Sequence, residues 1–257
     1  TDGDNLTNAN AGVGIASTTT LKIKNYDDYI NNYSEATNYN YAAKYPGSWA
    51  NGLKVCTIDD LADQRIGIGT TAPSQAGIVI GLGVTCSLDT AVAGLGATSS
   101  FVGYLKGIVT GINTDAAGGD SSVDVKIVSR VETVGSGATE TRIDYAESNR
   151  GKAFAVSDNL HFMTTAGVKT DGLGYTLSVT SVKDWYDEQT LGLTNSTVYW
   201  KSLAPKPVTN NYSETRNGGG DAIHIVVVDD EGSISGIQGN ILEKHVSLSK
   251  AVDSVSS

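Results

Sequence analysis

The chain has 257 residues, including 30 glycines and four prolines, and carries a formal net charge of −10 at pH 7. That length is enough to bury a substantial core, as one large domain or two modest ones. The charge is spread over the chain with no basic segment, so we do not expect a nucleic-acid interface or binding to an anionic membrane surface. The many Gly, Ser, Thr, Asn and Val residues favour a β-rich protein with numerous turns.

The first 60 residues predict little regular structure. Residues 1–20 have the composition of a loop, and Leu21–Lys24 alternates like a short strand. Asn25–Tyr45 is rich in tyrosine and asparagine, which indicates either a surface connection around one helical turn or a partner-binding surface. After the turn signal Pro46-Gly47, Leu53–Ile58 is predicted to be a strand.

From residue 61 to residue 182 the charges thin out and apolar runs of strand length recur. The predicted strands are Ile78–Cys86, Phe101–Ile112, Ser122–Val134, Thr139–Tyr145, Ala153–Ser157 and Gly174–Val182. Short strands separated by glycine-containing turns favour an antiparallel sandwich or barrel.

The strand Ser122–Val134 has a clear two-faced pattern. Val123, Val125, Ile127, Ser129 and Val131 share one face, and Asp124, Lys126, Arg130 and Glu132 share the other, which we expect to be solvated. In a hairpin with Thr139–Tyr145 we predict that Val131 lies opposite Ile143. That register also sets Arg130 against Asp144 and Glu132 against Arg142.

Residues 183–220 predict connecting structure. Lys183–Leu193 is a short polar bridge with an expected helical turn, Val198–Ser202 has strand character, and Thr209–Gly220 resembles a flexible loop.

The most strongly patterned stretch is Asp221–Asp253. Its β-branched run Ile223–Val228 predicts a strand buried on both faces. Ser233–Ile237 is short enough to return as a second strand. Asn240 and Glu243 have the spacing of a capping box, which predicts a helix through Lys250.

Few residues are candidates for chemistry. His161, His224 and His245 are the only histidines, and none lies in a nucleophile, phosphate-binding or zinc-binding motif. Cys56 and Cys86 are the only cysteines, so we expect two small core residues, although one bridge stays possible. We therefore predict no catalytic, cofactor-binding or metal-binding residue, and no enzyme.

Two carboxylate clusters, Asp229-Asp230-Glu231 and Asp59-Asp60, have the chemistry of calcium ligands. Neither follows the spacing of a 12-residue calcium loop. We expect both to be solvated turns.

Three segments resemble contractile-tail sheath proteins of T4-like bacteriophages. Ala43–Val55 reads AKYPGSWANGLKV, Val198–Pro205 reads VYWKSLAP, and His224–Ala251 reads HIVVVDDEGSISGIQGNILEKHVSLSKA. They occur in the family's order and flank the β-rich stretch. We therefore predict a discontinuous sheath-like domain, residues 1–60 with 183–257, interrupted by an inserted β-sandwich or β-barrel domain, 61–182. Leu53–Ile58 and Ile223–Val228 should then share a sheet, since neither end alone has enough strands. The expected class is α+β, mostly β, with an antiparallel β-sandwich body and a few flanking helices.

The resemblance implies a structural function. Sheath subunits stack as hexameric rings around the tail tube and contract to drive that tube through the host envelope, without cofactor or nucleotide. The implied partners are other sheath subunits, the tube and the baseplate, and the implied location is the virion, after assembly in the host cytoplasm. The family's joining terminal portions are not recognisable here, so we expect this chain alone to be a monomer. The alternative is an extracellular adhesin or glycan-binding β-sandwich protein, which the acidity and the Tyr/Asn-rich stretch favour.

Overall fold

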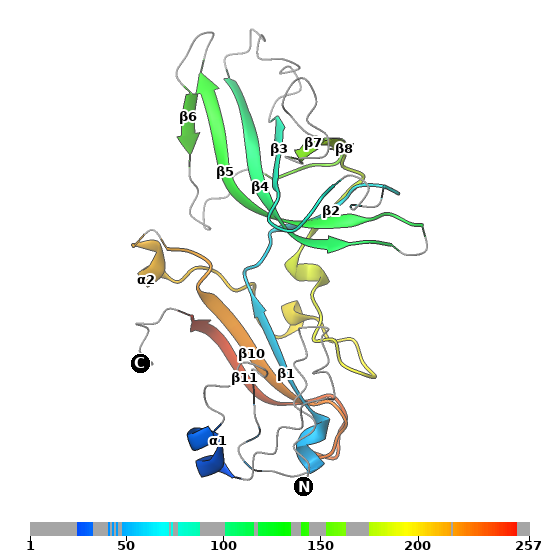
Figure 1. The fold of residues 1–257 in the computed structure, drawn as a ribbon, viewed down its shortest axis with the longest axis vertical. Coiled ribbons are helices and arrows are strands. Elements are labelled where there is room, and N and C mark those ends of the chain that lie inside the picture. Colours follow the sequence, from blue (N-terminus) through cyan, green and yellow to red (C-terminus); the bar gives the residue numbers. More distant parts are fainter. Residues whose placement is uncertain are drawn as a thin grey trace. The chain divides into compact units, whose positions relative to one another are not determined.

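The protein is mostly β, with two antiparallel sheets and two α-helices among the residues that the structure describes (Figure 1). This computed structural model describes residues 25–32, 41, 43, 45, 48–71, 73, 77–87, 101–115, 118–134, 140–143, 153–162, 175–216 and 218–250. The predicted mostly-β α+β class is confirmed. The predicted strand Leu21–Lys24 lies outside the described residues.

The chain divides into two compact units. One unit combines Thr1–Asp60 with Gln189–Ser257, and the other is Leu61–Glu188. The second boundary falls later than the residue-183 boundary expected from the sequence, because the strand β9 (Ser181–Asp184) pairs with β2 (Gln64–Gly67). We call them the discontinuous unit and the inserted unit.

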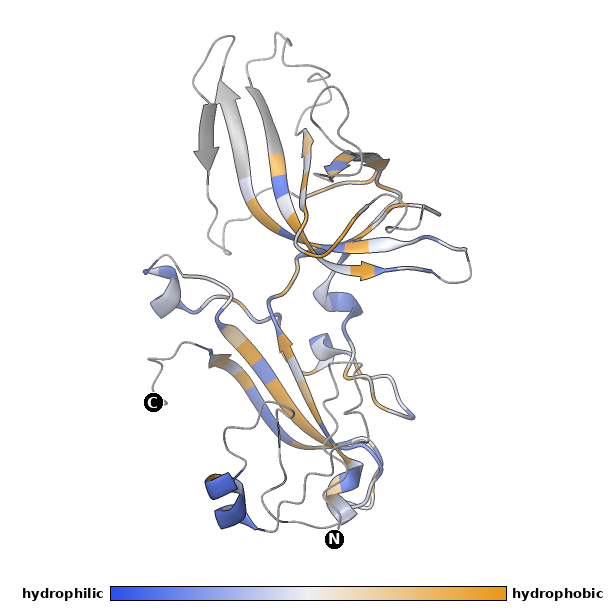
Figure 2. Ribbon diagram, in the orientation of Figure 1, coloured by the Kyte–Doolittle hydropathy of each residue, from blue (hydrophilic) through white to orange (hydrophobic). Residues whose placement is uncertain are grey.

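The discontinuous unit is built on a sheet with the order β1-β10-β11. Its strands are β1 (Leu53–Asp59), β10 (Ala222–Asp229) and β11 (Asn240–Ser249). Cys56 lies opposite Val226 across the β1–β10 pair, so the prediction that the two chain ends share a sheet is confirmed. Alternate residues of β10 are buried and the others are half-buried, as expected for a central strand. In Figure 2 β10 is largely orange, whereas β11 carries much more blue.

The predicted helix from Asn240 is wrong, because this segment is the strand β11. Ser233–Ile237 is likewise a turn and not a strand. The capping-box spacing is a local preference, and pairing along β10 offers main-chain hydrogen bonds along one whole edge of a buried strand. Gly232 helps to form the turn between β10 and β11, with a φ of 78° that side chains rarely adopt.

Two further segments of the same unit, predicted as a strand and as a flexible loop, contain short helices. Instead of a strand at Val198–Ser202, Tyr199 makes one bridge to Thr190 and the 3₁₀ helix η4 (Trp200–Ser202) follows. The chain curls here because Trp200 is buried, at 1% exposed. The expected flexible loop Thr209–Gly220 contains the capped helix α2 (Asn211–Glu214). The remaining helices of this unit are α1 (Tyr26–Asn32), the predicted helical turn, and the 3₁₀ helix η1 (Ser48–Gly52).

The inserted unit contains one antiparallel sheet of the order β8-β7-β3-β4-β5-β2-β9, with β6 paired to β5. Its other strands are β3 (Gly83–Ser87), β4 (Phe101–Asn113), β5 (Ser122–Val134), β6 (Glu140–Ile143), β7 (Asn159–Phe162) and β8 (Tyr175–Ser178). Only Val179 and Thr180 separate β8 from β9, although these strands stand at opposite ends of that order. The two end strands of the sheet are therefore neighbours in the chain, and the buried core of this unit includes Ile66, Leu105, Val125, Leu160 and Phe162.

Sequence patterns located the long strands of this unit better than the short ones. The predictions for β4 and β5 are confirmed, whereas Ile78–Cys86 is a strand only from Gly83 onward. Ala153–Ser157 is not a strand, and β7 was not predicted. The predicted strand Gly174–Val182 is divided into β8 and β9, since the chain changes partners at Val179.

The predicted register of the β5–β6 hairpin is wrong by one residue. Arg130 lies opposite Ile143 and Val131 lies opposite Arg142, where we expected Val131 opposite Ile143. The predicted register rested mainly on the apolar face and was refined by charged cross-strand pairs worth about 0.2–1 kcal/mol each. Because β6 is a four-residue edge strand, few such pairs act on it, and its register is weakly specified by side chains.

The apolar face of β5 is confirmed at Val123, Val125 and Ser129, which are all buried. The opposite face is not fully solvated, because Asp124 is only 6% exposed. Arg65 on β2 donates from Nε to Asp124 Oδ1 at 2.7 Å and from Nη2 to Oδ2 at 3.1 Å. This paired geometry provides the partner that a buried carboxylate needs.

Candidate functional site

His224 is a structural residue at the centre of the three-stranded sheet. Its side chain is fully buried and makes two hydrogen bonds. The backbone N–H of Ser247 donates to Nδ1 at 2.9 Å, and Nε2 donates to the carbonyl oxygen of Pro205 at 2.8 Å. Since a backbone N–H only donates and a carbonyl only accepts, these bonds fix the neutral Nε2–H tautomer. The ring thereby ties together β10, β11 and the segment after η4.

The other two histidines each have one described side-chain partner. His161 Nδ1 lies 3.1 Å from the Thr176 hydroxyl across the β7–β8 pair. His245 lies on β11, not on the predicted helix, and its Nε2 is 3.2 Å from Glu243 Oε2 at the surface. His224 and His245 lie in the same sheet and share no hydrogen bond among the described residues.

Asp229 organises the turn between β10 and β11. Its Oδ2 accepts from the backbone N–H groups of Ile234 (2.9 Å) and Ser235 (2.7 Å), and from the Ser235 hydroxyl (2.9 Å). Asp229 is fully buried, and Asp230 is 7% exposed, so the expectation of a solvated turn is wrong for both. Glu231 alone of this cluster is exposed.

The remaining carboxylates of the two clusters bind other parts of the discontinuous unit. Asp230 accepts from the Thr194 hydroxyl at 2.7 Å and lies 3.8 Å from Lys54 Nζ. Asp60 is 8% exposed, which also contradicts a solvated turn, and its Oδ1 lies 2.9 Å from Lys206 Nζ. Asp59, which is partly exposed, accepts from Lys250 Nζ at 3.0 Å. Within the described part of the chain, no group of three or more His, Cys, Asp or Glu residues is placed to bind a metal ion.

Acid should weaken the discontinuous unit through Asp229 and Asp221. Burial acts to raise the pKa of each carboxyl, but hydrogen bonds from neighbours outweigh it and hold both pKa values below the ordinary 3.8. A lowered folded-state pKa stabilises the fold above the unfolded pKa, and this stabilisation is lost as pH falls through the folded value. We expect urea midpoints that are flat from pH 7 to 5 and fall below pH 3.8.

The variant D229N isolates this contribution. It should be less stable than the wild type at pH 7, and this difference in stability should narrow as pH falls below 3.8, where the carboxyl is protonated first in the unfolded chain and, at lower pH, in the fold. E231Q changes an exposed carboxylate in the same turn, so its urea midpoint should match that of the wild type at each pH. A gap between D229N and the wild type that stays constant down to pH 2 would contradict the assignment.

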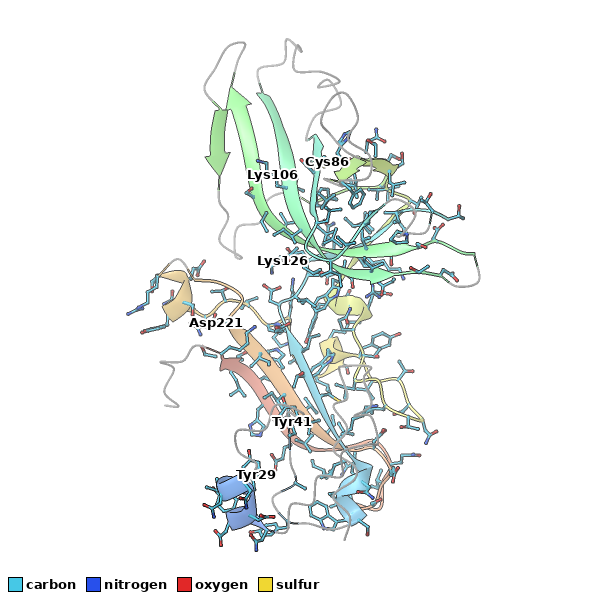
Figure 3. The ribbon with its side chains drawn as sticks, viewed as in Figure 1. Tyr29, Tyr41, Cys86, Lys106, Lys126 and Asp221 are labelled. Carbon is cyan, nitrogen blue, oxygen red and sulfur yellow. The ribbon has the colours of Figure 1, made fainter. Side chains whose placement is uncertain are left out.

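The two cysteines are free thiols buried in different units. Burial raises the pKa of Cys56 to about 11 and that of Cys86, labelled in Figure 3, to about 12. Because the thiolate is the reactive form, neither thiol should react with a disulfide reagent at pH 8 in the folded protein. Both should react once the chain is unfolded in urea, and rapid labelling of the native protein would contradict this result.

Comparisons with known proteins leave the family open. No protein-family model, no curated protein and no solved structure matches this chain. Among the described residues no helix is both long and apolar enough to cross a membrane.

Two features of the discontinuous unit were not predicted from the sequence. Asp229 is the last residue of a buried strand and precedes Gly232 and Ser235, a pattern in which a carboxylate accepts backbone N–H groups in a turn. Tyr212 and Arg216 have the i, i+4 spacing of neighbouring side chains on a helix, within a segment that we interpreted as a flexible loop.

Proposed function

We propose that this protein is a structural subunit of a contractile phage tail sheath. The observation that carries the proposal is the position of the three sheath-like segments. Ala43–Val55, Val198–Pro205 and His224–Ala251 all fall within the discontinuous unit, and the stretch without resemblance forms the inserted unit.

Specific contacts join the three segments. Val55 of the first lies opposite Val227 of the third in the β1–β10 pair. His224 of the third donates to Pro205 of the second, and Lys244 Nζ donates to the carbonyl oxygen of Leu203 at 3.1 Å. Segments separated by more than a hundred residues thus form one packed body, which supports a common origin with sheath subunits.

Three buried polar residues of this body make structural hydrogen bonds. His224, Asp229 and Asp230 join strands and turns to one another. A body of this kind suits a subunit that transmits force, because contraction of a sheath draws on free energy stored in contacts between subunits. The proposed reaction is therefore a rearrangement of subunits that needs no bound cofactor.

Electron microscopy of the full-length protein tests the proposal. We expect tubes of stacked rings, whereas dispersed particles that bind glycans would favour the adhesin alternative.

The 257-residue chain alone should sediment as a monomer at micromolar concentration in physiological salt. Chain ends that add a strand to a neighbour supply main-chain hydrogen bonds, which contacts between acidic bodies do not replace. Stable hexamers of this chain would contradict the monomer prediction.

A further inference from the structure

The segment Thr209–Gly220, here called the α2 loop, is held rigidly at its base. Asp221, labelled in Figure 3, accepts from the Asn210 backbone N–H at 3.1 Å and from the Asn210 side-chain amide. The Thr209 hydroxyl accepts from Gly220 N–H at 2.9 Å, which closes the loop. Asn210 in turn caps α2 by accepting from Ser213 N–H at 2.9 Å. The two ends of the loop are therefore fixed beside the start of β10.

The tip of the α2 loop presents an arginine stacked on a tyrosine. The guanidinium carbon of Arg216 lies 3.7 Å from the centre of the Tyr212 ring, and Tyr212 is 48% exposed. Arg216 Nη1 donates to the Tyr212 carbonyl at 3.1 Å and lies 3.5 Å from the Thr215 hydroxyl. These contacts hold the guanidinium plane in one orientation at an exposed position.

The unused edge of this guanidinium has the geometry of a carboxylate receptor. Nη1 makes the intramolecular bonds, so Nε and Nη2 are left as a parallel pair of donors. No described carboxylate forms an ion pair with Arg216, including Glu214 two residues away. A paired donor edge binds a carboxylate through two hydrogen bonds, and prior stacking reduces the entropy lost on binding.

We propose that the α2 loop docks, through Arg216 and Tyr212, onto a surface carboxylate of a second copy of this chain. Charge complementarity favours this occupant, since the chain has 28 acidic and 18 basic residues and exposes carboxylates such as Asp27, Asp120 and Glu231. Exposed Tyr and Arg are also the residues most enriched at interface hot spots. The choice of a second copy rests on the proposed sheath function.

The contact joins two different parts of the surface, the cationic tip of the α2 loop and an exposed carboxylate of the second copy. A contact of this heterologous kind repeats from copy to copy and generates rings or helical tubes. One exposed ion pair is too weak to hold two chains together at micromolar concentration. The α2 loop thus orients neighbouring copies within an assembly that other contacts hold together. The chain alone stays a monomer.

Charge reversal at Arg216 tests the docking contact in the full-length protein. R216E should raise the critical concentration for tube formation about tenfold, equivalent to about 1.4 kcal/mol. R216K keeps the charge but loses the paired donor edge and the stacking, so it should fall between R216E and the wild type. K201E is the matched control, with the same change in net charge at a lysine 5.6 Å from the Tyr199 ring, and it should leave the critical concentration unchanged. Equal effects of R216E and K201E would overturn the proposal.

A second measurement separates this proposal from the sheath function. If the wild-type full-length protein forms no tubes, the sheath proposal fails, and light scattering by the concentrated 257-residue chain still tests the contact. In low salt, R216E should then make the interaction between chains more repulsive than K201E does. An equal change in the two variants would overturn the docking proposal.

Discussion

Replacing Trp200 with alanine should destabilise the discontinuous unit by about 3–5 kcal/mol, the range for truncating a large aromatic core residue. Trp200 is 1% exposed, and its ring centre lies 6.5 Å from that of the buried His224. Its carbonyl oxygen also accepts from the N–H groups of Leu203 and Ala204, which close η4. Loss of the indole therefore leaves a cavity beside the polar centre of the sheet.

Hydrogen exchange measured by mass spectrometry in increasing urea would check this result. In W200A, protection should fall in β1 and β10 and stay unchanged in β4 and β5, because the inserted unit has its own core. W49A is the control, since Trp49 also lies in a 3₁₀ helix of the discontinuous unit but is 39% exposed. The prediction fails if W200A is no less stable than W49A.

The variant H224A should lose about 2–4 kcal/mol of stability. It removes a fully buried ring, and with it the hydrogen bonds to the Ser247 N–H and the Pro205 carbonyl, each worth about 0.5–1.5 kcal/mol. Ser247 has a φ of 57°, a left-handed conformation that non-glycine residues rarely adopt. The bond to His224 helps to hold that conformation, so β11 should loosen around Ser247.

Urea denaturation and amide exchange along β11 would measure the loss. H245A is the matched control on the same sheet, because the His245 side chain is 52% exposed and its removal should change stability by less than about 0.5 kcal/mol. H224Q should not restore stability, since one amide cannot reach both partners in the ring's geometry. Full stability of H224A would show that His224 does not hold β10, β11 and the segment after η4 together.

The sequence by itself determined the elements with a long, regular pattern. The alternation in β5 and the β-branched run of β10 each specify a strand because side-chain burial repeats along the whole element. That β1 and β10 share a sheet also followed from the sequence, since each end of the chain was short of strands. Turn-forming residues after β10 correctly marked the end of that strand.

Only the tertiary structure decided the conformation of segments whose local sequence signals compete with contacts to distant residues. Asn240–Ser249 has a helix start signal but pairs with β10, and Val198–Ser202 has strand residues but curls to bury Trp200. Hydrogen-bond partners likewise decided whether the candidate carboxylates are buried. Asp124 looks solvated in the sequence, but it is buried because Arg65, on another strand, donates to both of its oxygens. Asp229 also looks solvated, but it is buried with its Oδ2 bound by Ile234 and Ser235, in the turn that joins β10 to β11. The partner of Asp124 lies 59 residues away, so the sequence around Asp124 does not specify its burial.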